Sequence, residues 1–181
     1  MQKITRKKKI VLAILAANVA ILGALWATGE PELFTFNTTK SIPLGLYRLT
    51  SSDTDPLAVF CATGDQFAIA RARGYLAHSH SCPNDFIPMI KPIVARPGDT
   101  VTVSTGGIAV NGTTLPNSRA EDFDHLHRPM KPWPTGTYHV MQNTVWVISS
   151  YNEHSFDSRY FGPISIRLIQ HYAHAIWQVN K

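Results

Sequence analysis

The sequence has little charge, few cysteines and no repetitive stretch in its 181 residues. Only 16% of the residues are charged, and 44% are hydrophobic, which is too apolar for a disordered polypeptide. Internal repeats and low-complexity tracts are not evident, so neither a repeat array nor a disordered tract organises the chain. The length suits one compact domain with a short attachment and excludes a multidomain assembly.

Positive charge is in excess only within the first nine residues. Five of the 17 Lys and Arg residues are Lys3, Arg6, Lys7, Lys8 and Lys9, so 12 basic residues remain against 12 acidic ones in the rest of the chain. A nucleic-acid binder needs basic side chains spread over a face, where they displace counterions from phosphates. We therefore expect no nucleic-acid partner.

A long apolar run follows this basic cluster. Residues 10–28, IVLAILAANVAILGALWAT, contain no charged residue. A helix of this length would measure roughly 28 Å, close to the roughly 30 Å of a bilayer's hydrocarbon core. Because basic residues stay on the cytoplasmic side, we expect a cytoplasmic tail at residues 1–9, one transmembrane signal anchor at 10–28, and a domain outside the cytoplasm at 29–181. A cleaved secretory signal is the alternative, although the far end of the run offers no clean cleavage site.

The expected location outside the cytoplasm indicates the state of the two cysteines, Cys61 and Cys82. Thiols outside the cytoplasm are normally oxidised, so we expect a disulfide between them. Two reduced, buried thiols are the alternative, and a catalytic cysteine has little support.

Histidine is the one common metal ligand that the chain has in number. Two close pairs occur, His78 with His80 and His125 with His127, but neither belongs to a complete zinc signature such as H-E-x-x-H. We expect neither a metal nor another cofactor.

Short strands are expected to dominate the domain. Alternating or apolar β-rich segments occur at residues 45–50, 87–95, 99–104, 108–110, 113–115, 138–149 and 164–179. Gly106-Gly107 and Asn111-Gly112 fall between such segments, and Asn-Gly is the strongest short hairpin signal. The prolines within residues 87–95 favour an edge or irregular strand there.

One soluble helix is expected at residues 65–73, with Asp65 as its N-cap and Gly74 as its stop. Twelve prolines are scattered among the short strands. The pattern predicts a mainly β domain.

A serine and a lysine form a candidate catalytic pair. Ser41 lies in a polar turn, and Lys91 lies in an apolar segment. Taken alone, Ser41 is an ordinary turn residue and Lys91 an outward charge on an edge strand. Together they fit Ser/Lys hydrolysis, because burial can lower the pKa of a lysine until its neutral amine accepts the proton of a serine hydroxyl.

A third stretch, NEHSFDSRYFGPI, holds Ser155, Asp157, Ser158 and Arg159 beside a Gly-Pro break. Asp157 and Arg159 are either a surface ion pair of little energetic weight or a buried pair that supports a site. The residues alone leave both alternatives open.

The order of these motifs resembles the type I signal peptidase family, peptidase family S26. The resemblance covers nearly the whole chain: SIPLGLY after the apolar run, Lys91 ahead of Pro97-Gly98-Asp99, the GIAVNG hairpin, and SFDSRYFG. It implies a signal-peptidase-type (LexA/signal peptidase) β domain with one N-terminal transmembrane helix, and a serine endopeptidase activity.

The resemblance also implies roles for individual residues. Ser41 corresponds to the nucleophile and Lys91 to the general base. Thr39 falls where the family has its oxyanion-hole hydroxyl, which acts beside the backbone N–H of Ser41. Ser155 falls where a second serine orients the lysine amine, and Asp157 with Arg159 matches the supporting ion pair.

Several positions depart from the housekeeping signal peptidases, including Ile42, Pro92 and Ala95. SIPLGLYR, the two cysteines and RARGY instead resemble the TraF branch of conjugative-transfer peptidases. That branch implies a single-pass inner-membrane enzyme with a periplasmic catalytic domain. Its expected partners are a pilin precursor, which it cuts and in some systems closes into a ring, and the mating-pair (type IV secretion) components.

Two alternative functions remain. A general type I signal peptidase would cleave many exported precursors rather than one. A non-catalytic, membrane-tethered pilus or secretion assembly factor would keep the fold and tolerate the loss of Ser41 or Lys91.

Overall fold

The computed structural model describes residues 34–179. The predicted cytoplasmic tail and transmembrane segment lie outside these residues, so the structure does not test them. Among residues 34–179, no helix has the length and apolar character needed to cross a membrane.

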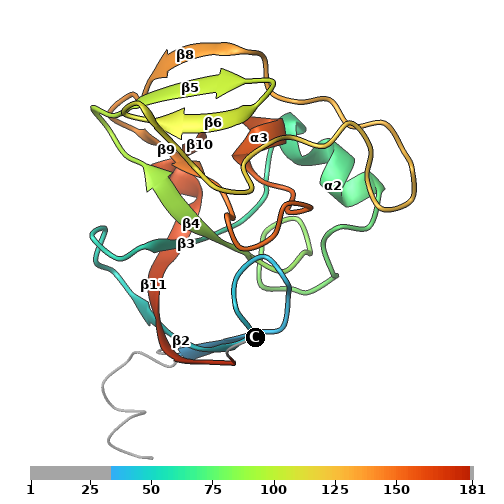
Figure 1. Ribbon diagram of the computed structural model, residues 1–181. Coiled ribbons are helices and arrows are strands. Elements are labelled where there is room, and N and C mark those ends of the chain that lie inside the picture. Colours follow the sequence, from blue (N-terminus) through green and yellow to red (C-terminus); the bar gives the residue numbers. More distant parts are fainter. Residues whose placement is uncertain (1–33, 180–181) are drawn as a thin grey trace, which may run out of the picture. The chain divides into compact units, whose positions relative to one another are not determined.

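A larger sheet carries both members of the candidate pair. Its seven strands are antiparallel and run in the order β1-β2-β11-β3-β4-β9-β10 (Figure 1). Their bounds are β1 (Phe34–Asn37), β2 (Gly45–Thr50), β3 (Leu57–Phe60), β4 (Met89–Ala95), β9 (Thr144–Val147), β10 (Ile164–Ser165) and β11 (Ile169–Gln178). Ser41 lies on the turn between β1 and β2, and Lys91 lies on β4.

A smaller sheet of four strands has the order β7-β6-β5-β8. Its bounds are β5 (Thr100–Ser104), β6 (Gly107–Val110), β7 (Thr113–Thr114) and β8 (Gly136–His139). The β6–β7 hairpin turns at Asn111 and Gly112, whose φ angles of 49° and 83° are both positive. A type I′ turn requires such angles, so the expected Asn-Gly hairpin is confirmed. The mainly β prediction is confirmed as well.

The strand prediction is incomplete. Strands β1 and β3 are not among the predicted segments, and the β-rich residues 138–149 divide between β8 and β9, which belong to different sheets. Of the two interpretations of residues 87–95, the edge strand is wrong, because β4 lies between β3 and β9, and the irregular strand is confirmed. Its prolines are accommodated by an irregularity between Ile93 and Ala95, where the register with β9 shifts.

The expected helix begins differently from the prediction. Residues Asp65–Phe67 form a 3₁₀ turn (η1), and only Ala68–Ala72 (α2) are α-helical. Gly64 occupies the N-cap, and no side chain caps the turn, so the assignment of Asp65 as N-cap is wrong. The first turn is instead closed by the backbone, with the N–H of Phe67 donating to Gly64 O, while the Phe67 ring is fully buried. Gly74 follows the helix with a φ of 71°, as a helix stop does.

The remaining helical turns are α3 (Ser158–Phe161) and η2 (Ile166–Leu168). The ring of Phe161 packs with those of Phe60 and Phe67 in the main hydrophobic core, which also contains Met89 of β4. The core therefore fixes the strand of Lys91 and places α3 close to it.

Cys61 and Cys82 form a disulfide with an S–S distance of 2.12 Å. Both cysteines are buried, and the bridge ties the end of β3 to the segment that leads into β4. Closing a loop of this length contributes about 3 kcal/mol in the chain-entropy account. The disulfide thus restrains the strand that carries Lys91.

Gly45 permits an unusually close approach of β2 and β11. A Cβ built at this position would lie 2.1 Å from the carbonyl oxygen of Trp177. Any other residue at position 45 would have to separate the two strands. Gly45 directly follows the turn of Ser41. The close approach of β2 and β11 at this residue therefore fixes the position at which the turn ends.

Candidate active site

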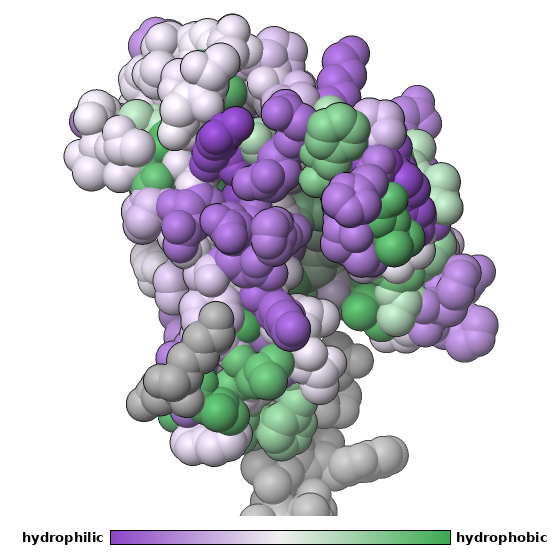
Figure 2. Space-filling model, turned by 45° about the vertical axis from the view of Figure 1, so that its right-hand side comes forward, coloured by the Kyte–Doolittle hydropathy of each residue, from purple (hydrophilic) through white to green (hydrophobic). Residues whose placement is uncertain are grey.

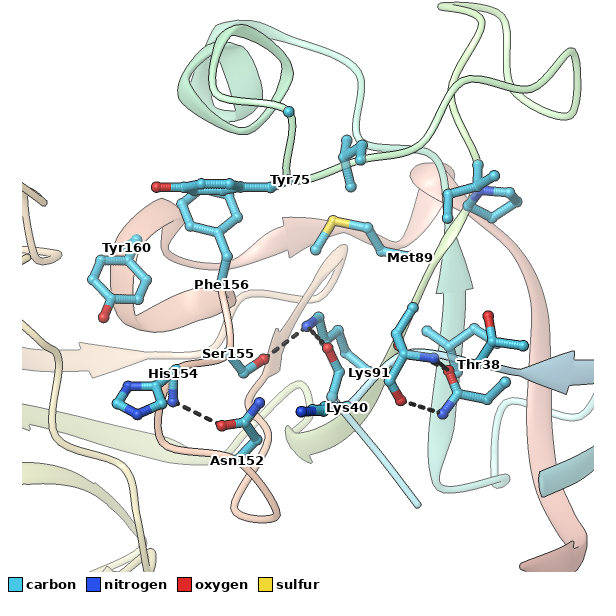
Figure 3. A pocket seen from close by; sticks show the side chains of 18 of the residues that line it. Thr38, Lys40, Tyr75, Met89, Lys91, Asn152, His154, Ser155, Phe156 and Tyr160 are labelled. Carbon is cyan, nitrogen blue, oxygen red and sulfur yellow. Dashed lines mark hydrogen bonds between the residues drawn. The ribbon is translucent and has the colours of Figure 1, made fainter. Parts of the chain in front are cut away.

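Ser41 and Lys91 meet although 50 residues separate them. The Lys91 Nζ lies 2.6 Å from the Ser41 Oγ and 2.7 Å from the Ser155 Oγ, in hydrogen bonds to both. The close-up shows the dashed contacts from Lys91 to two hydroxyls, one of which belongs to Ser155 (Figure 3). A serine hydroxyl within hydrogen-bond reach of an amine is the arrangement that proton transfer requires.

The surroundings of Lys91 favour its neutral form. The residue is 4% exposed, and burial lowers the pKa of its amine from 10.5 to about 8. The negative charge of Asp157 opposes this effect and raises the pKa, whereas the positive charge of Arg159 lowers it. Desolvation outweighs the charge of Asp157, because the Asp157 carboxylate is paired with Arg159 rather than hydrogen-bonded to the amine. The interpretation of Lys91 as an exposed edge charge is therefore wrong.

Asp157 and Arg159 form a fully buried, bidentate ion pair. Arg159 Nε donates to Asp157 Oδ1 and Arg159 Nη2 to Oδ2, each at 2.8 Å, and both side chains have no exposed surface. The surface-pair alternative is therefore wrong. The pair restrains the segment that carries Ser155, because Arg159 Nη2 also donates to the Ser155 carbonyl at 3.0 Å.

Ser149, which no sequence motif singles out, links this pair to the turn that carries Ser41. Its backbone N–H donates to Asp157 Oδ2 at 3.0 Å, and its side-chain hydroxyl donates to the carbonyl oxygen of Ser41. The residue is fully buried. Ser149 thereby connects the turn of Ser41 to the ion pair that restrains the segment of Ser155.

Asn37, the last residue of β1, is a second supporting residue that the sequence patterns do not reveal. Its buried carboxamide makes five hydrogen bonds within the turn that carries Ser41. The Nδ2 group donates to the carbonyl oxygens of Thr39, Ile42 and Pro43. The Oδ1 atom accepts from the backbone N–H of Thr39 at 3.1 Å and from its hydroxyl at 2.8 Å. Asn37 thus supports the turn that carries Ser41 from within.

Thr39 is expected to supply an oxyanion-hole hydroxyl, and it lines the same cleft as Ser41. In this structure its hydroxyl proton is directed at Asn37 Oδ1. Rotation about the Cβ–Oγ bond would free this proton from Asn37 Oδ1 for another acceptor. Asn37 Oδ1 would still hold the backbone N–H of Thr39, so the rotation leaves no buried acceptor without a partner.

Replacing Asn37 by aspartate is expected to lower the cleavage rate at least about tenfold, because a carboxylate cannot donate to three carbonyl oxygens and repels them. The measurement is the rate of substrate cleavage, together with the melting temperature, for the Asn37→Asp and Asn117→Asp variants. Asn117 is a matched control, since its exposed side chain donates to only one carbonyl, that of Ser150. Equal rates in the two variants would show that Asn37 does not organise the turn.

A cleft of about 680 Å³ opens beside the pair of Ser41 and Lys91. Met89, Phe156 and Tyr75 form its apolar side, and Asn152 and His154 lie near Ser155 on the opposite side (Figure 3). A cleft of this size accommodates several residues of a peptide. Its apolar lining favours a substrate segment with little charge near the point of attack.

The histidine pairs do not converge on a metal site. Within residues 34–179, no three His, Cys, Asp or Glu side chains are placed to share a metal ion. The His78 ring stacks on Phe86, and His80 lies beside Asp85 at 3.1 Å. His78 thus packs on a neighbouring ring, whereas His80 is an exposed side chain in a surface pair with Asp85.

Several known proteins are similar to this chain in sequence. The family model described as signal peptidase, peptidase S26, matches residues 6–178. Plasmid transfer protein TraF of Escherichia coli is 34% identical over 168 residues, which cover 91% of this chain and 92% of that protein. The probable conjugal transfer protein TraF of Sinorhizobium fredii is 35% identical over 167 residues, which cover 88% of this chain and 84% of that protein.

Among solved structures, that of a signal peptidase I from Enterococcus faecalis V583 is similar to this chain. It aligns with a TM-score of 0.37 and 16% identity, covering 68% of this chain and 97% of that one. A score this low transfers nothing from that structure to this chain.

Proposed function

The chain belongs to the signal peptidase family of peptidases, S26, in the branch of the TraF conjugative-transfer proteins, and we propose that it is a serine endopeptidase with Ser41 as nucleophile and Lys91 as general base. One observation carries this proposal. The Ser41 Oγ lies 2.6 Å from a buried lysine amine whose pKa is lowered to about 8. Close to neutral pH, such an amine can accept the proton that a serine must lose before it attacks a carbonyl.

The reaction begins when the neutral Lys91 amine takes the proton of the Ser41 hydroxyl and the Oγ attacks the scissile carbonyl carbon. The backbone N–H of Ser41 and the rotated hydroxyl of Thr39 stabilise the negative oxygen of the tetrahedral intermediate. Protonated Lys91 then gives its proton to the leaving amine, and an ester between Ser41 and the substrate remains. The Ser155 hydroxyl, 2.7 Å from Nζ, keeps the Lys91 amine directed at the Ser41 hydroxyl and then at the leaving amine.

The ester is resolved by a second nucleophile. Water, deprotonated by Lys91, releases a shortened peptide. A substrate amino group held near the ester would instead form a new peptide bond and close a ring, because an oriented amine has a high effective concentration. Both routes use the same residues, and they differ by one water in the mass of the product.

The substrate that we propose is a pilin precursor of a conjugative-transfer apparatus. The names of the relatives refer to plasmid and conjugal transfer, and those relatives match at 34–35% identity over most of this chain. The other expected partners, the components of the mating-pair apparatus, are proposed on the same basis.

Intact-mass spectrometry of small membrane proteins tests this function. Cells that carry the apparatus are compared with either the wild-type chain or Ser41→Ala. One pilin-sized species should be shortened only with the wild type, and a further deficit of one water would identify ring closure. Shortening of many exported proteins would favour a general signal peptidase. Identical profiles would refute the peptidase and favour an assembly factor.

We further propose that the protein is anchored in the inner membrane by residues 10–28, with its catalytic domain in the periplasm. The described domain supports this proposal with an exposed apolar edge, defined as Phe34, Phe36, Leu44, Ile176, Trp177 and Val179, whose exposed fractions range from 42% to 71%. Pairing of β1 and β11 with β2 brings these residues together, and Figure 2 shows apolar side chains gathered at the lower end of the domain.

Cell fractionation tests this location. The full chain should stay in the membrane pellet after alkaline extraction, and protease added to spheroplasts should digest its domain. A domain that is protected from protease, or that is released by alkali, would contradict the proposal.

A further inference from the structure

A compact loop at the mouth of the cleft is not used by the proposed chemistry. Residues 121–130, here called the rim loop, lie in the long connection between β7 and β8. The loop closes on the carboxylate of Asp124, which accepts hydrogen bonds from the backbone N–H groups of Leu126 and Arg128 and from Arg128 Nε at 2.7 Å. Phe123 and Pro129 face each other as an isolated antiparallel bridge. The rim loop is therefore an internally fixed turn.

Asp124 also fastens the rim loop to the chain segment after α2. The Tyr75 hydroxyl donates to Asp124 Oδ2 at 2.5 Å, and Arg73 Nη2 donates to the Pro129 carbonyl at 2.9 Å. The Asp124 side chain is only 7% exposed. The Tyr75 ring in turn packs edge-on against Phe156, at 5.4 Å between ring centres, and Phe156 directly follows Ser155. A continuous set of contacts thus connects the rim loop to the residue that orients Lys91.

This fixed loop carries two large apolar side chains that the domain leaves uncovered. Phe123 is 58% exposed and Leu126 is 60% exposed. Phe123 lines the same cleft as Ser41 and Lys91, whereas Leu126 does not. Exposing a phenyl ring to water on a rigid support has a free-energy cost that is recovered when a ligand covers the ring. Because Phe123 lines the cleft, the ligand that covers its ring is a peptide bound in the cleft.

We propose that Phe123 is a specificity-determining residue, which contacts an apolar side chain of the bound peptide, and that Asp124 is the positioning residue that holds Phe123 at the cleft. The proposal rests on the proposed function, because it needs a peptide in the cleft. It assigns the rim loop to the recognition of substrate rather than to bond cleavage. Substrates with a large apolar residue at the matching position are therefore preferred over those with a polar one.

A peptide library tests the proposal even where the natural substrate is not identified. The full-length protein, purified in detergent, is incubated with peptides from a bacterial proteome digest, and the cleavage products are identified by mass spectrometry. The wild type should show a preference for large apolar residues at one position near the cut. In Phe123→Ala this preference should fall about tenfold, in Phe123→Leu it should largely return, and in Asp124→Asn it should fall in part.

Leu126→Ala is the matched control, since it removes an equally exposed apolar side chain from the same loop but outside the cleft. It should keep the wild-type profile, and Ser41→Ala should give no products. A wild-type profile in Phe123→Ala, with Ser41→Ala blank, would overturn the role of Phe123 and leave the peptidase function standing. Products that persist in Ser41→Ala would overturn the proposed function, and the role of Phe123 with it.

Discussion

Replacing Lys91 by methionine is expected to slow precursor cleavage at least about a thousandfold while the domain remains folded. Methionine is unbranched and only one atom shorter than lysine, and it packs well in an apolar site, but it has no group that accepts a proton. Lys91 is buried beside Ser41, and no other amine is hydrogen-bonded to that hydroxyl in the described part of the chain. The measurement is the rate at which the full precursor disappears, compared with the melting temperature of each variant.

The Lys91→Met substitution, which should lower activity, should not lower the stability of the domain. The lowering of the Lys91 pKa from 10.5 to about 8 corresponds to a cost of about 3 kcal/mol for burying the protonated amine. The unfolded chain binds more protons than the folded one between these two pH values, so the cost is fully present below pH 8 and disappears as the pH rises toward 10.5. Lys91→Met should therefore melt at or above the wild-type temperature at pH 7.

The pH dependence of kcat/KM distinguishes a Lys91 that acts as a base from a Lys91 that only supplies a positive charge. The neutral fraction of Lys91 increases tenfold per pH unit below its pKa, so kcat/KM should rise with pH and level off above about 8. Lys91→Arg keeps a positive charge but cannot lose its proton, so it should be as inactive as the methionine variant. Substantial activity in Lys91→Arg, or a flat profile from acid to alkaline pH, would exclude Lys91 as the base.

Replacing Arg159 by methionine is expected to destabilise the domain by about 3–5 kcal/mol, because it leaves the charge of Asp157 buried without an opposite charge beside it. Arg159 also donates to the carbonyl oxygens of Asn117, Arg119, Asn152, Glu153 and Ser155, and all five of these hydrogen bonds would be lost. For a chain of this size, such a loss lowers the melting temperature by about 10 °C or more. Thermal unfolding of the oxidised, full-length protein measures it.

Two further variants make this result interpretable. Arg167→Met removes an exposed arginine and should change the melting temperature little. The double variant Asp157→Asn, Arg159→Met should be more stable than Arg159→Met alone, since it removes the unpaired charge. If the single and double variants melted at the same temperature, the lost carbonyl contacts would explain the effect and the ion pair would not.

Local backbone chemistry explains which parts of the fold could be predicted from the sequence. The hairpin at Asn111-Gly112 depends on two positive φ angles that these residues adopt readily, so it could be placed independently of the rest of the chain. Strand β3 could not, because Leu57–Phe60 is a short apolar run buried on both faces, and such a run has no alternation to mark it. The prolines around Lys91 suggested an edge, whereas a shift of register keeps β4 inside the sheet.

The candidate site also contains some residues that could be predicted from the sequence and others that could not. Ser41, Lys91, Ser155, Asp157 and Arg159 could be nominated because their order along the chain matches a family pattern. Asn37 and Ser149 could not, because their side chains act on carbonyl oxygens, and every residue has one. Only the folded chain shows which of these oxygens lie within reach. The rim loop could not be recognised either, because only the folded chain brings Asp124 within hydrogen-bond distance of Tyr75.

The position of β11 has a consequence for the order in which the protein matures. This strand comes last among the described strands, yet it lies between β2 and β3 in the sheet. The turn of Ser41 leads into β2, and Lys91 lies on β4 beyond β3, so β11 is the piece that joins the two halves. While the chain is still being made, β2 and β3 cannot be connected within the sheet by main-chain hydrogen bonds, because the strand that pairs with both is absent. The larger sheet is therefore completed only when the last of the described strands has been synthesised and inserted.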